Sequence, residues 1–195
     1  MKLVNGVGVN DADYVVTPTV NGKQVWCPYY RVWKGMMDRA YGGFKKRNTY
    51  EDVTVDTEWH SFMNFKDWMA KQDWEGKELD KDLLVEGNKV YGPDSCVFVS
   101  SDVNLFLTDC RKVRGGLPTG VSFYRRTGKY QAKVSIDGKN IKHLGYYDTP
   151  DEANSAYKKA KLDQAIKLSE LQTNISVAES LISRYSQHMG KANIQ

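Results

Sequence analysis

The stretch Gly120–Pro150, GVSFYRRTGKYQAKVSIDGKNIKHLGYYDTP, decides the fold of the carboxyl-terminal part of the chain. Residues 120–136 read as two strands joined by an Arg-Thr-Gly turn, and Asp137-Gly138 is a hairpin signal that leads into a third strand at 139–145. Thr149 is a suitable N-cap for a helix that opens at Pro150, with acidic residues in its first turn. The pattern predicts a three-stranded antiparallel sheet packed on one helix.

The two faces of this sheet follow from the alternation along its middle strand. The apolar residues of the strand are expected to face the helix, and they are Ala132, Val134 and Ile136. Because side chains alternate with a period of two, the residues between them point outward. These are Gln131, Lys133 and Ser135. The outward face is therefore predicted to be polar and basic.

The charge of the chain is concentrated in the same region. Between Cys110 and Gly145 there are nine basic residues and one acidic residue, a net charge of +8, whereas the whole chain carries +4. The rest of the chain therefore carries −4. Such an asymmetry is typical of a segment that neutralises phosphates, since a merely solvated surface usually mixes both signs.

Several short motifs recur together over about fifty residues of this segment. They are Gly120-Val121, Gly128-Lys129-Tyr130, Ala132-Lys133-Val134, His143–Thr149, and Glu152-Ala153 followed by Ala156-Tyr157. With this pattern the segment resembles the plant ethylene-response-factor (ERF, APETALA-type) DNA-binding domain, which also occurs in phage proteins. The resemblance implies that the outer face of the sheet enters the major groove of double-stranded DNA.

Carried over position by position, the resemblance gives a set of expected DNA contacts. Ser122, Tyr124, Lys133 and Ser135 occupy contact positions, and Arg125, Arg126 and Lys129 flank the turn. Gln131 from the outward face and Lys142 from the basic segment complete the set. Several contact positions that hold arginine in the plant domains hold other residues here, so phosphate binding is expected to carry over better than base readout.

The amino-terminal half contains a hairpin and two helices. An alternating stretch at 14–25 is broken by Asn21-Gly22, which predicts a hairpin. Apolar residues at helical spacing predict helices at 29–41 and 61–72, whose aromatic residues are interpreted as core.

A second family resemblance covers nearly all of residues 29–104. Its motifs are Tyr30–Trp33, Met36–Tyr41, Glu58–Phe62, Asn64-Phe65, Trp68-Met69, Leu79–Asp82, Gly87–Tyr91 and Pro93–Val99. In these the chain resembles phage-encoded HNH-type homing endonucleases. The resemblance implies a hairpin-and-helix finger at 79–99, in which a divalent cation, Mg²⁺ or alternatively Mn²⁺, stabilises phosphate charge and Asn88 bridges the two arms.

The finger departs from the HNH pattern at its histidines. Asp80 and Asp82 stand where the motif has its first pair, and they are the expected metal ligands because oxygen ligands suit Mg²⁺. Their alternative interpretation is that they cap backbone amides in a turn. His60 is the nearest candidate base in sequence, and its favoured interpretation is structural. Cys96 is interpreted as a small buried residue.

From Lys167 to Tyr185 the apolar residues of the tail show a heptad-like spacing, which predicts an amphipathic helix. The stripe consists of Leu168, Leu171, Ile175, Ala178, Ile182 and Tyr185. This helix either pairs with a second copy of the chain in a homodimer or folds back on its own chain. The predicted segments are a hairpin at 1–28, an HNH-like ββα-metal domain at 29–110, a basic linker at 111–118, an ERF-type domain at 119–167 and a helix at 168–195. The fold class is therefore α+β.

Composition excludes several other classes. No apolar run is long enough to span a membrane, and no secretory signal precedes the first motif, so a cytoplasmic protein is expected, in the host cytoplasm if phage-encoded. The three cysteines share no CxxC spacing, which favours reduced thiols. The leading hypothesis is a homing-type endonuclease, and the second is a non-catalytic DNA-binding regulator or anti-host factor. RNA binding is disfavoured because no aromatic stacking platform is evident in the sequence.

Overall fold

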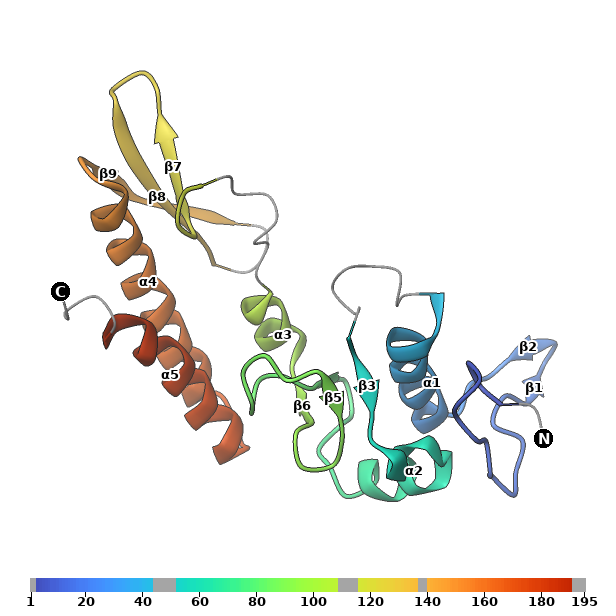
Figure 1. Cartoon of the computed structure of the whole chain (residues 1–195). Coiled ribbons are helices and arrows are strands. Elements are labelled where there is room, and N and C mark those ends of the chain that lie inside the picture. Colours follow the sequence, from blue (N-terminus) through green and yellow to red (C-terminus); the bar gives the residue numbers. More distant parts are fainter. Residues whose placement is uncertain (1–2, 44–51, 109–115, 137–139, 191–195) are drawn as a thin grey trace. The chain divides into compact units, whose positions relative to one another are not determined.

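A computed structural model describes residues 3–43, 52–108, 116–136 and 140–190 of the chain (Figure 1). The chain is mixed α+β and forms two compact units, Met1–Val99 and Ser100–Gln195. The α+β class agrees with the sequence analysis. Among the described helices, none combines the length and the apolar character needed to cross a bilayer.

Among its described residues, the first unit contains three pairs of short strands, two α-helices and a 3-10 helix. Its elements are β1 (Thr19–Val20), β2 (Lys23–Gln24), α1 (Pro28–Tyr41), β3 (Thr54–Val55), the 3-10 helix η2 (Thr57–His60), α2 (Phe62–Met69), β4 (Glu78–Asp80), β5 (Val90–Tyr91) and β6 (Val97–Val99). The β1–β2 and β4–β6 pairs are antiparallel, and the β3–β5 pair is parallel. Asn21 and Gly22 both have positive φ, as a tight hairpin turn requires, so the predicted hairpin is confirmed.

Aromatic residues on α1, η2 and α2 form the core of this unit. Trp33, Trp59, Phe62 and Phe65 are completely buried, and the Trp33 indole donates a 2.8 Å hydrogen bond to the Trp59 carbonyl. Burial of each large apolar side chain contributes about 1.5–3 kcal/mol. The interpretation of the aromatics in the predicted 61–72 helix as core is confirmed for Phe62 and Phe65, and Trp68 packs partly buried against the same cluster. Helix α2 is shorter than the predicted 61–72.

The described part of the second unit contains a three-stranded sheet and three helices. They are α3 (Ser101–Leu107), β7 (Val121–Tyr124), β8 (Lys129–Ser135), β9 (Ile141–Tyr147), α4 (Pro150–Glu170) and α5 (Ile175–Gly190). The strands are antiparallel in the order β7-β8-β9. The helix α4 begins with a capping box in which Thr149 and Glu152 each accept a hydrogen bond from the other residue's backbone amide.

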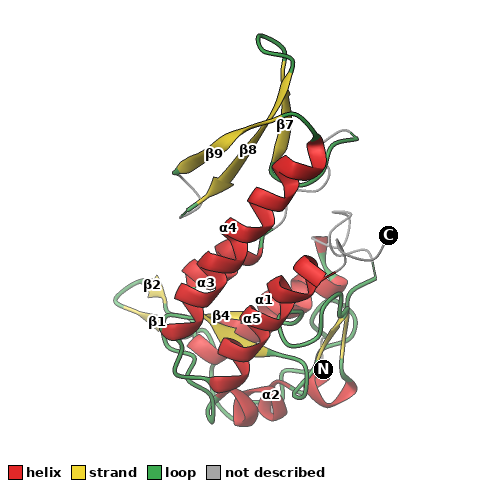
Figure 2. Ribbon diagram, turned by 90° about the vertical axis from the view of Figure 1, so that its left-hand side faces the viewer, coloured by secondary structure: helices red, strands yellow, loops and turns green. Residues whose placement is uncertain are grey.

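Small residues hold α4 close to the sheet. Val121, Ala132 and Ala153 form the buried cluster between them. Gly120 lies against the ring of Tyr157, where an added Cβ would fall 2.0 Å from a ring carbon. Figure 2 shows α4 as the long helix that runs away from the sheet.

The helix α3 belongs to the second unit. The Phe106 ring lies 4.8 Å from that of Tyr185 on α5, and the ammonium group of Lys161 on α4 donates to the Phe106 carbonyl at 2.8 Å. Because of these contacts the second unit begins at Ser100, whereas the sequence analysis placed α3 in the first domain, which was expected to end at residue 110. Most of the predicted linker at 111–118 lies outside the described residues.

The predicted single tail helix is wrong in its bounds. The helix α4 continues to Glu170, the chain turns, and Asn174 caps α5 through its side-chain oxygen, which accepts from the Val177 amide at 3.2 Å. The two helices lie side by side (Figure 1). The tail therefore folds back on its own chain, and pairing with a second copy remains a prediction.

The buried stripe of the tail also differs from the predicted heptads. Leu171 and Ile175, both in the expected stripe, are 77% and 73% exposed, whereas Val177 and Leu181 are buried. The turn between the helices resets the helical phase, so the spacing across residues 167–185 does not describe one continuous face.

Candidate nucleic-acid interface and metal centre

The outer face of the β7-β8-β9 sheet contains most of the expected DNA contacts. In the strand register Ser122 lies opposite Gln131, and Tyr124 lies opposite Lys129, so all four share one face. The Gln131 side-chain amide donates to the Ser122 hydroxyl oxygen at 3.0 Å. Ala132 and Val134 are buried on the other face, as the alternation predicted.

A β-bulge changes which residues of β9 join this face. The register shifts between Ala132 and Lys133, so Gln131 pairs with Tyr146 while Lys133 pairs with His143. A bulge of this kind inserts one extra residue and breaks strict alternation. Tyr146 and His143, three residues apart, therefore both lie on the outer face.

The same bulge puts Lys142 on the face of the sheet that is turned toward α4. Lys142 pairs with Val134, which is buried toward α4, so Lys142 is exposed on the face opposite to Lys133. It does not belong to the outer surface expected for it. Ile136 also differs from its prediction, because it lies beyond the end of β8 and is 57% exposed.

Three rings form a row across the outer face. The Tyr124 and Tyr146 ring centroids are 5.2 Å apart, and those of His143 and Tyr146 are 4.6 Å apart. The Arg126 guanidinium lies 5.8 Å from the Tyr124 ring centroid. This row could not be predicted from the sequence, because strict alternation separates positions 143 and 146 onto opposite faces. We call Tyr124, His143 and Tyr146 the aromatic row.

Basic side chains border the aromatic row. Arg125, Arg126 and Lys133 are exposed, and Lys129 makes an ion pair of 2.9 Å with Asp148. Ser135 is also exposed, and its carbonyl accepts a hydrogen bond from Gln164 on α4. Among the described members of the expected DNA-binding set, all except Lys142 thus lie on the outer face or in the turn beside it.

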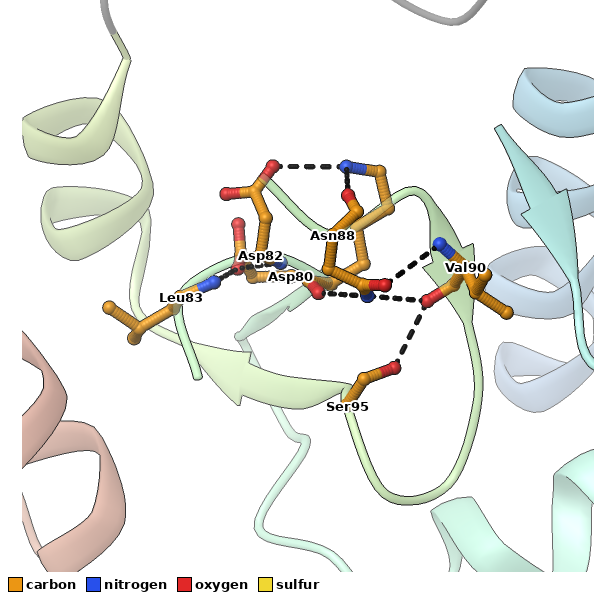
Figure 3. A network of polar contacts seen from close by, with 7 residues as sticks. Asp80, Asp82, Leu83, Asn88, Val90 and Ser95 are labelled. Carbon is orange, nitrogen blue, oxygen red and sulfur yellow. Dashed lines mark hydrogen bonds and ion pairs between the residues drawn. The ribbon is translucent and has the colours of Figure 1, made fainter. Parts of the chain in front are cut away.

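The 80–95 loop of the first unit is organised around Asn88 (Figure 3). Its side-chain amide donates to the carbonyls of Lys81 and Val90, both at 2.6 Å, and its oxygen accepts from the Val90 amide at 3.1 Å. The Ser95 hydroxyl donates to the same Val90 carbonyl at 3.0 Å. Asn88 thus joins the two sides of the loop, the structural place that the resemblance implied for it.

The two carboxylates flank Lys81, which Asn88 contacts (Figure 3). One oxygen of Asp80 accepts hydrogen bonds from the backbone amides of Asp82 and Leu83, at 3.0 and 2.7 Å. The Lys81 ammonium group donates to Asp82 at 3.0 Å. Burial, and then the negative charge of Asp82, raise the pKa of Asp80 above its ordinary value. A bound cation would therefore stabilise the negative charge of the Asp80 and Asp82 carboxylates.

The donor set fits one mode of Mg²⁺ binding. In that mode one or two protein carboxylates hold the ion, and water and substrate phosphates complete its shell. Within the described parts of the chain, no group of three or more His, Cys, Asp or Glu side chains could hold a metal ion. Asp80 and Asp82 therefore fit a site in which they supply part of the coordination shell of Mg²⁺ and a substrate phosphate and water supply the rest.

Two cations lie near the Tyr91 ring, and one of them, Lys81, also pairs with Asp82. The Arg39 guanidinium on α1 and the Lys81 ammonium group lie 5.5 and 6.0 Å from the centroid of the Tyr91 ring. Such contacts stabilise the cations against the π face of the ring. They link α1 to the loop that holds the carboxylates.

His60 has structural partners among the described residues. One ring nitrogen lies 3.1 Å from the Val55 carbonyl and 3.4 Å from the Tyr41 hydroxyl, and the Tyr41 ring lies edge-on to it. These contacts tie η2 to β3 and α1, in agreement with the structural interpretation of this histidine.

The described cysteines are free thiols. Cys96 is 5% exposed, and burial raises its pKa to about 12, so the interpretation as a small buried residue is confirmed. Cys27 is half-buried. Cys110 lies outside the described residues.

Comparison of the chain with protein-family models, with curated proteins and with solved structures finds no match.

Proposed function

We propose that this protein binds double-stranded DNA through the outer face of the β7-β8-β9 sheet. The observation that carries the proposal is the shared placement of exposed Arg125, Arg126 and Lys133 with the polar pair Ser122 and Gln131. Cationic side chains bind phosphates by releasing condensed counterions, and polar side chains on a sheet can reach base edges in the major groove. The ERF resemblance supports the same surface.

Lys142 supplies a matched control for this surface. Lys133 and Lys142 are both exposed and lie on neighbouring strands, but the register puts them on opposite faces. In fluorescence anisotropy with a labelled duplex, Lys133→Ala is expected to weaken binding and to reduce the salt dependence by about one counterion. Lys142→Ala is expected to leave both unchanged. Equal effects of the two variants would contradict the proposed surface.

For the first unit we propose metal-dependent hydrolysis of DNA phosphodiester bonds, as in an HNH-type homing endonuclease. The support is the Asp80 and Asp82 pair, held on a loop that Asn88 cross-links. A bound Mg²⁺ would stabilise charge on the phosphate and on the leaving oxygen. The two carboxylates would hold that cation, and the second unit would bind the DNA.

A nicking assay on supercoiled DNA with Mg²⁺ or Mn²⁺ tests the nuclease. Asp82→Asn removes one charge from the carboxylate pair and is expected to abolish nicking. Glu86→Gln is the matched control, because Glu86 is an exposed carboxylate in the same loop. Nicking that survives in Asp82→Asn would contradict this assignment of the site.

A specific observation favours a second function, a non-catalytic DNA-binding protein such as a regulator or an anti-host factor. Asp80 already accepts hydrogen bonds from two backbone amides, and Asp82 is paired with Lys81. His60 contacts Val55 and Tyr41. Each candidate group thus has a structural role. Duplex binding without nicking under any divalent cation would favour this second function.

A further inference from the structure

The aromatic row adds exposed π faces to a surface whose other side chains reach phosphates and base edges. Tyr146 is 47% exposed, His143 is exposed, and Tyr124 is half-buried. In a duplex each base is stacked between its neighbours, and only its edges are presented in the grooves. The π faces of exposed rings can therefore stack on bases only where those bases are unpaired.

We infer that the aromatic row binds unpaired bases of single-stranded DNA by stacking. This inference rests on the proposed function and names a second form of DNA for the same face. Sequence-tolerant binding of single strands combines aromatic stacking with a positively charged surface along the backbone. The row and its neighbours Arg126 and Lys133 supply both components on one side of the sheet.

The geometry of the rings defines how bases lie on the row. The three rings contact one another, with centroids 5.2 and 4.6 Å apart, so bases stack on the solvent side of the row. Arg126 lies over the Tyr124 ring at one end. Its guanidinium can stack on the next base or pair with the phosphate that follows.

The bulge in β9 is the structural device that makes the row. It places His143 and Tyr146 on one face although they are three residues apart. Gly145, in the bulge, has a φ of +143°, a conformation that L side chains rarely adopt. Glycine at position 145 therefore allows the backbone conformation that brings His143 and Tyr146 to the outer face.

The test compares two DNA forms on the intact protein. Fluorescence anisotropy is measured with a labelled oligo-dT of about twelve nucleotides, within the range of known single-strand site sizes, and with a labelled duplex. Tyr146→Leu removes the ring and is expected to weaken oligo-dT binding at least tenfold and duplex binding by a much smaller factor, because the bases of a duplex are already stacked. Tyr146→Phe keeps the ring and is expected to bind oligo-dT like the wild type.

Two different variants distinguish this inference from the proposed function. Loss of duplex binding in Lys133→Ala tests the basic surface, whereas selective loss of oligo-dT binding in Tyr146→Leu tests the aromatic row. Absence of oligo-dT binding by the wild type, or equal loss on both DNA forms in a Tyr146→Leu protein with wild-type circular dichroism, would overturn the inference. Tighter binding of an oligo-U RNA of equal length than of oligo-dT would overturn its assignment to DNA.

Discussion

Asn88 and Lys81 hold each other across the loop of the first unit. The Asn88 side-chain amide donates to the Lys81 carbonyl at 2.6 Å, and the Lys81 ammonium group donates to the Asn88 carbonyl at 2.9 Å. The same ammonium group pairs with Asp82. The position of the carboxylate pair therefore depends on a neutral amide seven residues away.

Replacement of Asn88 is expected to destabilise the first unit. Asn88→Ala removes three hydrogen bonds that join the two sides of the loop, at a cost of about 2–3 kcal/mol. Urea unfolding followed by tryptophan fluorescence reports on this unit alone, because all five tryptophans precede residue 100. Ser95→Ala, which removes the weaker support of the Val90 carbonyl, is the control and should cost about 1 kcal/mol. A smaller loss in Asn88→Ala than in Ser95→Ala would contradict the role given to Asn88.

Gly120→Ala is expected to destabilise the second unit strongly. Gly120 has a φ of +74°, and an added Cβ would lie 2.0 Å from the Tyr157 ring. The left-handed conformation costs about 1–2 kcal/mol for an L residue, and overpacking adds about 1–3 kcal/mol. Gly128→Ala is the matched control, since Gly128 has a φ of +70° and no atom near its would-be Cβ. Thermal unfolding followed by circular dichroism should show the larger loss for Gly120→Ala, and equal losses would refute the packing argument.

Lys161 is expected to make the stability of the second unit depend on pH. Burial, and then the charge of Arg184, lower the pKa of Lys161 from 10.5 to about 8. Between about pH 8 and 10.5 the unfolded chain then binds more protons than the folded one, so stability rises with pH across this window. Below about pH 8 both states are protonated and this contribution is lost. Urea unfolding followed by circular dichroism at several pH values gives the free energy of unfolding. In Lys161→Met this free energy should rise less steeply between about pH 8 and 10.5 than in the wild type. An equally steep rise in the variant would exclude Lys161 as its source.

Asp80→Asn is expected to stabilise the first unit at pH 7 in the absence of divalent cations. The pKa of Asp80 is raised, so its contribution to stability is present at low pH and is lost as pH rises through the raised pKa. An asparagine oxygen can still accept from the Asp82 and Leu83 amides, but without the buried charge. Tryptophan-detected urea unfolding measures the difference.

The same variant examines the metal site. If Asp80 and Asp82 hold Mg²⁺, addition of the cation should stabilise the wild type and have no effect on Asp80→Asn. Equal stabilisation of both proteins would place the cation elsewhere.

The sequence by itself determined the local elements of this protein. Alternation at 129–135 identified Ala132 and Val134 as buried, the Asn21-Gly22 dipeptide identified a hairpin, and Thr149 identified the start of a helix. These features depend on neighbours within a few residues, so short-range patterns suffice to predict them.

Only the tertiary structure decided which residues share a surface. The bulge in β9 moved Lys142 off the outer face and brought His143 beside Tyr146, and the turn after α4 exposed Leu171 while it buried Leu181. One inserted residue in a strand, or one break in a helix, shifts the phase of every side chain that follows. Periodicity alone does not reveal where that shift occurs, because it is set by packing against elements distant in sequence.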